Sequence, residues 1–217
     1  MPDLDGVIRR RHSTRMFLPD KPVPRELLDE ALTLAMRAPS NSNIQPWRLF
    51  LATGARRDRL GGALAAAVRA TPPPAMGIPQ SHIHLRRQLG ALVYGAMGVA
   101  REDTAGRWNA QLRNWDFFHA PVAGIVCMHQ DLGFADAIGV GMFLQTLLLA
   151  LTDRGLDTCV QVSTALYPEV VREQLDIPAE LTVLCGICIG YADPTFAANF
   201  LDIPRNAVSD NVVVYQD

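Results

Sequence analysis

The hydrophobic positions of this chain follow two different spacings. Apolar residues recur every three or four positions in seven segments, which is the pattern of amphipathic helices. These segments span residues 4–11, 24–37, 56–69, 83–102, 103–114, 134–154 and 168–175. Short apolar runs bounded by Gly, Pro or polar residues predict strands at 48–53, 121–128, 157–162 and 181–191. Helices dominate, so the pattern favours an α+β or α/β sandwich in which helices cover a modest sheet.

The segment 134–154 is apolar on nearly all sides, which is typical of a helix at the centre of a core. Its most apolar run, 138–151, is shorter than the ~20 residues that a membrane span requires, and Gln145 interrupts it. We therefore expect a buried helix and no membrane association. Gly139 and Gly141 would let another backbone approach closely, for instance across a two-fold axis.

The C-terminal stretch 193–217 carries few helix signals and ends in the apolar run 212–215. A strand-like Val-Val-Val-Tyr run at an exposed edge would promote aggregation. We therefore expect this stretch to form an arm that pairs with the sheet edge of a partner subunit. The chain shows no internal repeat and no linker, so the sequence predicts a single domain over residues 1–217.

Composition narrows the classes of function. The 217 residues are 49% hydrophobic and carry a formal net charge of −2. This balance indicates a folded core and offers no electrostatic footprint for nucleic acid or an anionic membrane. The acidic opening sequence Met-Pro-Asp-Leu-Asp lacks the apolar region of a signal peptide, so we expect a cytoplasmic protein.

The cysteines are Cys127, Cys159, Cys185 and Cys188. Cys185 and Cys188 have the CxxC spacing of redox and metal sites, but both lie within a predicted strand. Residues three apart on a strand point to opposite faces, so the two thiols should diverge. We therefore expect no bound metal ion and no disulfide.

Two polar segments are candidate binding elements. The segment 11–15, Arg-His-Ser-Thr-Arg, places two guanidinium groups beside two hydroxyls, which suits a phosphate or another anion. The segment 38–47, Ala-Pro-Ser-Asn-Ser-Asn-Ile-Gln-Pro-Trp, offers donors and acceptors for a planar heterocycle. Its two prolines would keep it extended and outside helix and sheet. The plainer alternatives are a solvated helix end and an ordinary connecting loop.

Aromatic residues gather in and after the predicted helix 103–114; they are Trp108, Trp115, Phe117 and Phe118. These side chains would line a pocket for a planar substrate, although packing is their commoner role. No GxGxxG fingerprint follows a predicted strand, which argues against a Rossmann dehydrogenase.

Four segments, taken in order, resemble the signatures of the FMN-dependent nitroreductase family. The segment 11–17 resembles the opening signature of the family, and 39–47 matches its second signature. The segments 155–161 and 186–194 resemble its two C-terminal blocks. Arg205 falls where the family has a phosphate-binding arginine.

This resemblance implies an α+β nitroreductase-like fold: a central, mostly antiparallel sheet flanked by helices, with a C-terminal extension that reaches the partner subunit. It also implies a homodimer with FMN at the interface. The implied cofactor-binding residues are Arg11, His12, Ser13, Arg15, Pro39, Ser40, Asn41, Asn43, Gln161, Val162, Ser163 and Arg205. Those between 39 and 43 would reach the flavin ring of the other subunit, and the backbone at 161–163 would face flavin N5.

The implied activity is a ping-pong reaction in which NADPH or NADH reduces the flavin and a nitroaromatic or similar electron-poor acceptor reoxidises it through N5. The block 117–121 resembles the nitrobenzoate- and nitroaromatic-reducing members. Because the flavin carries the redox chemistry, no catalytic side chain is singled out. Two alternatives stay open. One is a flavoenzyme of the same fold with other reductive chemistry, namely dehalogenation, enone reduction or flavin fragmentation; the other is a non-catalytic FMN-binding protein.

Overall fold

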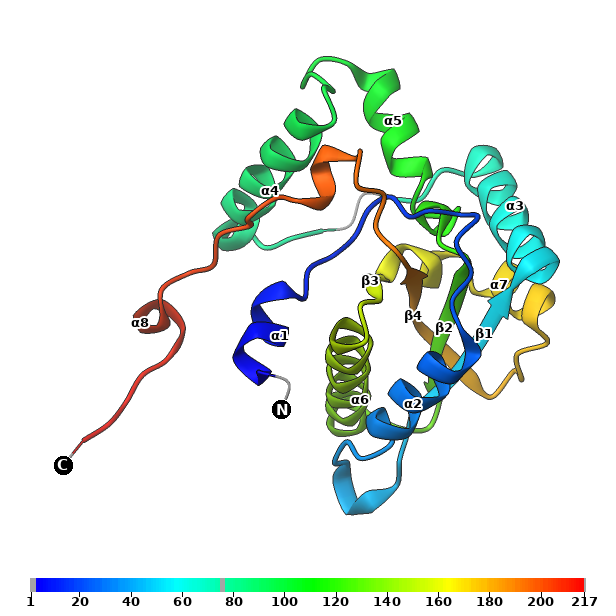
Figure 1. Ribbon diagram of the computed structural model, residues 1–217, viewed down its shortest axis with the longest axis vertical. Helices are drawn as coiled ribbons and strands as arrows, with labels where there is room; N and C mark the ends of the chain where they lie inside the picture. The colour runs from blue at the N-terminus through cyan, green and yellow to red at the C-terminus, as the bar shows by residue number, and fades with distance from the viewer. Residues whose placement is uncertain (1–2, 75–76, 217) are drawn as a thin grey trace.

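The computed structural model describes residues 3–74 and 77–216, in which helices cover both faces of a four-stranded sheet (Figure 1). The strand order is β1 (Arg48–Thr53), β2 (Val122–His129), β4 (Leu181–Gly190) and β3 (Asp157–Gln161). Every neighbouring pair is antiparallel. The expected α+β class is confirmed, and each strand lies within a residue of its predicted position.

Helices α1 to α7 follow the predicted order along the chain, and the short helix α8 was not predicted. The α-helices are α1 (Leu4–Arg10), α2 (Arg25–Ala35), α3 (Gly54–Ala70), α4 (Ile83–Ala96), α5 (Thr104–Leu112), α6 (Phe134–Asp153), α7 (Pro168–Leu175) and α8 (Val208–Asn211). The short 3₁₀ segments are η1 (Asn41–Asn43), η2 (Gln80–His82), η3 (Phe117–His119), η4 (Val162–Leu166) and η5 (Ala197–Asn199). Helices α2 and α6 pack on one face of the sheet, and α3 and α7 on the other.

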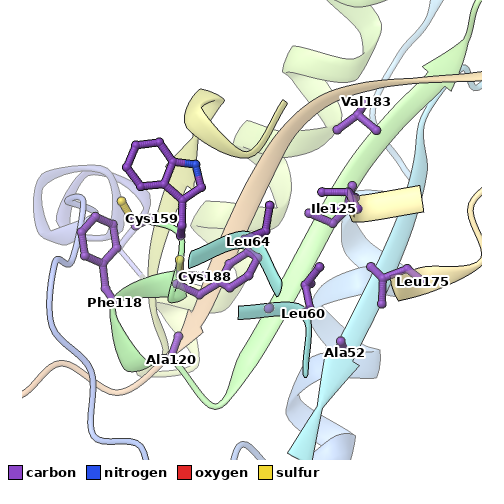
Figure 2. Close-up of a cluster of buried hydrophobic side chains, with 14 of the residues drawn as sticks. Ala52, Leu60, Leu64, Phe118, Ala120, Ile125, Cys159, Leu175, Val183 and Cys188 are labelled. Atoms are coloured by element: carbon purple, nitrogen blue, oxygen red, sulfur yellow. The ribbon is translucent and has the colours of Figure 1, made fainter. Parts of the chain in front are cut away.

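The two faces of the sheet form two separate cores. In β2, Ala123 and Ile125 enter the α3/α7 core, part of which Figure 2 shows, while Val122 and Val126 enter the α2/α6 core. This alternation is the period of two of a β-strand. In β4 the alternation reverses at a bulge between Val183 and Cys185. The bulge thus moves the odd-numbered residues of β4 from the α3/α7 core to the α2/α6 core.

Cys185 and Cys188 lie in different cores, as their spacing on a strand predicted. Burial raises the pKa of the Cys185 thiol to about 11 and also raises the pKa of Cys188. Because the thiolate is the nucleophile and the metal ligand, these groups are inert at neutral pH. Within residues 3–74 and 77–216, no group of three or more His, Cys, Asp and Glu residues is arranged to hold a metal ion.

The helix expected over 83–102 is shorter than its hydrophobic pattern indicated. Helix α4 ends at Ala96, and Gly98 adopts a left-handed conformation with φ of +68°. Glycine takes this conformation at little cost and commonly ends a helix. A new helix, α5, starts after Asp103, whose carboxylate accepts the backbone N–H of Gly106 at 2.8 Å.

Helix α6 is not surrounded by core, and that expectation is wrong for the single chain. Phe143, Leu147 and Leu151 are buried against the sheet, but Ile138 and Met142 are 47% and 40% exposed. By length and composition α6 passes for a membrane-crossing helix, with a mean hydropathy of 1.8, although 44% of that stretch is buried inside the protein. An apolar helix face therefore stays open in the described chain.

The first part of the C-terminal stretch is hydrogen-bonded to the rest of the protein, and the part beyond η5 extends away from it. The Asn199 side chain donates to the carbonyl oxygens of Met16 at 2.8 Å and Asp193 at 3.1 Å, and accepts the backbone N–H of Arg15 at 2.8 Å. Beyond η5 the chain extends away from the sheet (Figure 1, red). In the described part of this arm the run 212–215 is exposed and joins no strand, so its pairing with a partner stays a prediction.

Candidate functional site

The segment 11–15 is fixed against strand β3. Ser13 forms a parallel bridge with Thr158, and the backbone N–H of Thr14 donates to the carbonyl oxygen of Thr158 at 2.9 Å. Burial raises the pKa of the Cys159 thiol to about 11, although the positive charges of Arg15 and Arg11 oppose that rise. The bridge thus brings two guanidinium groups close to Cys159, near the start of β3.

Arg11 and Arg205 come together from opposite ends of the chain. The pKa of Arg11 is lowered, mainly by burial and secondly by the positive charge of Arg205. Arg205 is exposed, and its Nη1 donates to the carbonyl oxygens of Ile203 at 2.6 Å and Pro204 at 3.2 Å. Two cations held side by side favour an anion between them, and guanidinium groups bind phosphate oxygens with good geometry.

Backbone contacts, and not a carboxylate, hold Arg15. Its Nη1 donates to the carbonyl oxygen of Ser13 at 3.0 Å. The neighbouring His12 is engaged within the same segment, with Nδ1 at 2.8 Å from the Arg10 carbonyl oxygen and Nε2 at 3.3 Å from the Thr14 hydroxyl. These local contacts give the segment its shape and leave the charge of Arg15 available.

The segment 161–163, at the end of β3, separates into a packed side chain and an open edge. The Gln161 amide donates to the Asn114 carbonyl oxygen at 2.7 Å and accepts from the Cys188 thiol at 3.1 Å, so only its backbone is left for a ligand. Val162 is 53% exposed. The hydroxyl of Ser163 is buried and has no hydrogen-bond partner among the described residues. An unpaired buried hydroxyl costs free energy, so it fits a site where a bound group supplies that bond.

The segment 38–47 forms the light blue loop at the bottom of Figure 1, away from segment 11–15, which follows α1 near the middle of the view. It is not extended, contrary to expectation, because it closes into η1 with positive φ angles at Ser42, Asn43 and Gln45. The Ser40 hydroxyl accepts the backbone N–H of Gln45 at 3.0 Å and so stabilises this turn. Pro39, Ser40, Asn41 and Asn43 therefore contribute nothing to the 11–15 site of their own chain.

Gly139 explains how α6 approaches this loop. A Cβ atom on Gly139 would lie 3.2 Å from the Cβ of Ser40, which is tighter than most contacts in proteins. The close approach expected at this glycine is thus made within the chain. Gly141 stays exposed, with no atom within 4 Å of its ideal Cβ position among the described residues.

The four candidate aromatic residues divide between packing and lining. Trp115 and Phe117 are buried in the α3/α7 core, and Trp108 packs against that core. For these three the structure favours the packing alternative. Phe118, which Figure 2 shows near Cys159, also lines a cavity together with Arg15.

The sequence pattern did not predict the left-handed turn that positions Phe117 and Phe118. Phe117, Phe118 and His119 have φ angles of 50°, 51° and 64°, a conformation that non-glycine residues rarely adopt. The buried Arg57 clamps this turn, since its Nε donates to the Ala120 carbonyl oxygen at 2.8 Å and its Nη1 to the Asp116 carboxylate at 3.0 Å.

His119 contacts the same carboxylate, with Nδ1 at 2.7 Å from Asp116. Burial pushes the pKa of Asp116 upward, but the contacts and charges of His119 and Arg57 outweigh burial and lower it. The acid therefore stays ionised and keeps the clamp in place. No local signal marked this network, because Arg57 is far in the sequence from Asp116 and His119.

The sequence also did not reveal a cavity of about 780 Å³ between α4 and α5. Leu89, Val93 and Tyr94 contribute to its apolar part. Its arginines are Arg15, Arg86, Arg87, Arg101, Arg107 and Arg113. Positive charge therefore surrounds an apolar interior, which suits an anionic ligand with a flat apolar part.

Comparison with known proteins identifies the class of protein to which this fold and site belong. The chain belongs to the nitroreductase family, whose profile matches residues 8–191. It is 35% identical over 208 residues to the 4-nitrobenzoate reductase of Pseudomonas putida, covering 94% of this chain and 91% of that protein. It is 37% identical over 216 residues to the nitrobenzene nitroreductase of Ectopseudomonas oleovorans, covering 94% and 93%.

Solved structures agree with this family. The FMN and NADPH-dependent nitroreductase NfnB from Sphigopyxis sp. strain HMH superposes with a TM-score of 0.94 at 30% identity, over 99% of this chain and 100% of that one. The FMN-dependent NfnB from Mycobacterium smegmatis in complex with NADPH gives a TM-score of 0.89 at 32% identity, with the same coverage. The resemblance of the sequence motifs is therefore confirmed, and so is the nitroreductase-like fold.

Proposed function

We propose that this protein is an FMN-dependent NAD(P)H oxidoreductase that reduces nitroaromatic or similar electron-poor acceptors in a ping-pong cycle. The observation that carries the proposal is strand β3, to which segment 11–15 is bridged at Thr158 and after which the unpaired buried hydroxyl of Ser163 follows. The relatives named for reducing nitrobenzoate and nitrobenzene support the choice of acceptor.

The residues bridged to β3 and those that follow it fit FMN. Arg11 and Arg205 would bind its phosphate, because their adjacent charges lack a carboxylate contact among the described ion pairs. Ser13 and Arg15 would hold the ribityl chain and the pyrimidine edge. The exposed residue Val162 and the hydroxyl of Ser163 would face the flavin ring.

When bound, FMN supplies the hydride chemistry, and the protein supplies position and charge. The guanidinium of Arg15, oriented by its hydrogen bond to the Ser13 carbonyl oxygen, would stabilise negative charge on the flavin without having to reorient. Phe118, held in its turn by Arg57 and Asp116, lines the same cavity as Arg15 and would shield that side of the flavin from water. The Trp115 indole donates to the Ser163 carbonyl oxygen at 3.2 Å and so fixes the backbone that faces the ring.

We propose further that the protein is a homodimer with FMN at the interface. The exposed apolar residues of α6, Ile138 and Met142, and of α1, Leu4 and Ile8, supply a surface for a second subunit. The distance between segments 38–47 and 11–15 within one chain supports a loop that serves the partner's flavin (Figure 1). The chain would be one FMN-binding domain, 1–217, with an arm over 193–217, acting in the cytoplasm.

A mixed dimer tests the shared site. Arg11→Ala and Asn43→Ala protomers are each expected to bind FMN poorly or turn over slowly as homodimers. A dimer with one protomer of each kind would contain one intact site, because the intact Arg11 and the intact Asn43 would meet across the interface. Recovery to about half of the normal activity per dimer supports the arrangement. No recovery contradicts it.

Anaerobic flavin bleaching tests the activity. The FMN-loaded protein is titrated with NADPH or NADH while the flavin absorbance is followed, and a nitroaromatic is then added. We expect bleaching by the nicotinamide and return of the absorbance with the nitroaromatic. Bleaching without return points to the other reductive chemistries. No bleaching by either nucleotide identifies a non-catalytic FMN-binding protein and refutes the proposal.

A further inference from the structure

Asn199 is a buried polar residue at the start of the C-terminal arm, and the flavin chemistry described above gives it no role. We propose that Asn199 is a positioning residue of the FMN site, whose side-chain amide fixes both the backbone of Arg15 and the point from which the chain continues to Arg205. In this role it acts through these two arginines and not by contact with the cofactor. The inference rests on the proposed function, because the arginines serve FMN only if the protein binds it.

The Asn199 side chain uses both ends of its amide group. Its Oδ1 accepts the backbone N–H of Arg15 at 2.8 Å, and its Nδ2 donates to the carbonyl oxygens of Met16 at 2.8 Å and Asp193 at 3.1 Å. The residue is 2% exposed, so water does not replace these bonds when they are lost. A short side chain that offers one acceptor and two donors is an asparagine, since serine has a single donor and aspartate has none.

Two of these bonds lie on either side of the Arg15 Cα atom. The N–H of Arg15 precedes that atom along the chain, and the carbonyl group of Met16 follows it. The direction in which the Arg15 side chain leaves the backbone is therefore fixed, and the Ser13 carbonyl oxygen fixes its guanidinium end at 3.0 Å. A charge that is already oriented stabilises a developing negative charge better than one that must first reorient.

The same amide fixes the start of the arm. The segment η5, which ends at Asn199, contacts α4 and lies beside the chain that follows α1 (Figure 1, orange). Arg205 is six residues further on, and the described residues between them form no helix or strand. Such a segment reaches at most about 3.3–3.6 Å per residue from its last fixed point. The position of Asn199 thus limits where Arg205 can meet the charge of Arg11.

Backbone contacts join the same two parts of the chain without the help of Asn199. The backbone N–H of Leu18 donates to the Tyr191 carbonyl oxygen at 2.9 Å, and the neighbouring residues Phe17 and Ala192 form an antiparallel bridge. These contacts remain when the side chain of Asn199 is removed. Its removal should therefore leave the sheet intact and release the segments that carry the two arginines.

The test compares the unaltered protein with Asn199→Ala and Asn199→Ser. Alanine removes all three hydrogen bonds, whereas serine can restore one of them and is the milder variant if alanine impairs folding. Arg172→Ala is the matched control, because it also removes a side-chain bond to the backbone, from Nη2 to the Leu181 carbonyl oxygen at 2.7 Å, on the α3/α7 side of the sheet. The measurements are the Kd of FMN by fluorescence titration, the reduction potential of the bound flavin, the unfolding of the apoprotein and hydrogen exchange at the Arg15 amide.

We expect Asn199→Ala to raise the Kd of FMN by about three- to tenfold. The flavin potential should shift to a more negative value, because a less well oriented Arg15 stabilises the negative charge of the reduced flavin less. The Arg15 amide should exchange faster in the apoprotein, since it loses its acceptor. The serine variant should show smaller changes of the same sign.

The control should lower the stability of the apoprotein and change neither the Kd of FMN nor the flavin potential. If Asn199→Ala behaves like this control, its role is structural and the proposal is overturned.

A double-mutant cycle tests whether Asn199 acts through Arg205. Because Arg205→Ala already removes a phosphate contact, the addition of Asn199→Ala should raise the Kd of FMN by only about twofold or less. Equal factors in the presence and absence of Arg205 would overturn the proposal. The same cycle with Arg172→Ala should be additive.

Failure of the proposed function gives a different result. If the unaltered protein binds FMN but neither NADPH nor NADH bleaches it, the oxidoreductase activity is refuted. The FMN titrations and the exchange of the Arg15 amide then still test the role of Asn199, and chemical reduction gives the potential. Absence of FMN binding by the unaltered protein would overturn both proposals.

Discussion

Two arginines in this protein, Arg57 and Arg11, differ in whether the chain itself supplies a partner for the charge of the guanidinium group. Arg57 is 8% exposed and contacts the carboxylate of Asp116 and the carbonyl oxygen of Ala120. The pKa of Arg11 is lowered, first by partial burial and second by the positive charge of Arg205. The first arginine is satisfied inside the chain, whereas the second is held where its charge is unfavourable until an anion arrives.

The difference distinguishes an arginine that stabilises the fold from an arginine that is placed to bind a ligand. A buried charge with its own acid stabilises the fold, and removing either partner leaves the other uncompensated. A cation placed near another cation does not stabilise the apoprotein, so its position is explained by a ligand. Removing Arg57 and removing Arg11 should therefore affect different quantities.

The largest effect is expected for Arg57→Ala. This substitution leaves the Ala120 carbonyl oxygen and one side of Asp116 without their donor and releases the left-handed turn at 117–119. We expect the free energy of unfolding to fall by about 2–4 kcal/mol. Denaturant unfolding of the apoprotein measures it.

The control for this change is Arg25→Ala, which removes an exposed i,i+4 pair with Asp29. Such a pair contributes about 0.3–0.5 kcal/mol. Equal losses for the two variants would show that Arg57 is an ordinary surface arginine and would remove the contrast.

The second effect is expected for Arg11→Ala. The variant should bind FMN more weakly by ~1.5–3 kcal/mol, because it loses a charge-assisted phosphate contact. The stability of the apoprotein should change by no more than about 0.5 kcal/mol. Fluorescence titration with FMN and apoprotein unfolding measure the two quantities, with the exposed Arg9→Ala as the control. Unchanged FMN affinity would refute the assignment.

The smallest effect is expected for Ser163→Ala, and its sign is the informative part. Removing a buried hydroxyl without a partner should stabilise the apoprotein by about 0.5–1 kcal/mol. The same change should weaken FMN binding by about 0.5–1.5 kcal/mol, since one hydrogen bond to the cofactor is lost. The exposed Ser209→Ala serves as the control. A less stable apoprotein would mean that this hydroxyl has a structural partner.

Local chemistry made much of the fold predictable. The strand at 122–129 is apolar on both faces, and the structure buries both. The end of α4 also has a local signal, since Gly98 is a typical helix-ending residue. The apolar pattern that continues beyond this glycine led to the longer predicted helix. The segment 11–15 was identifiable because its charges and hydroxyls are consecutive.

Other features depend on contacts between distant segments. Nothing in Phe117, Phe118 or His119 indicates a left-handed turn, since none of them is Gly or Asn; the turn persists because Arg57 holds it from α3. The charged cavity depends on the angle between α4 and α5, which the local sequence pattern does not predict. The bulge in β4 could not be predicted either, because apolar residues occupy both faces of that strand and leave no alternation to be interrupted.

The bulge in β4 bears on how this protein loses its structure. Before it, Leu181 and Val183 belong to the α3/α7 core; after it, Cys185, Ile187 and Ile189 belong to the α2/α6 core. One continuous backbone thus joins the two cores at the middle of the sheet. Melting either core would loosen the strand that supports the other, so the two layers should unfold together in one cooperative transition.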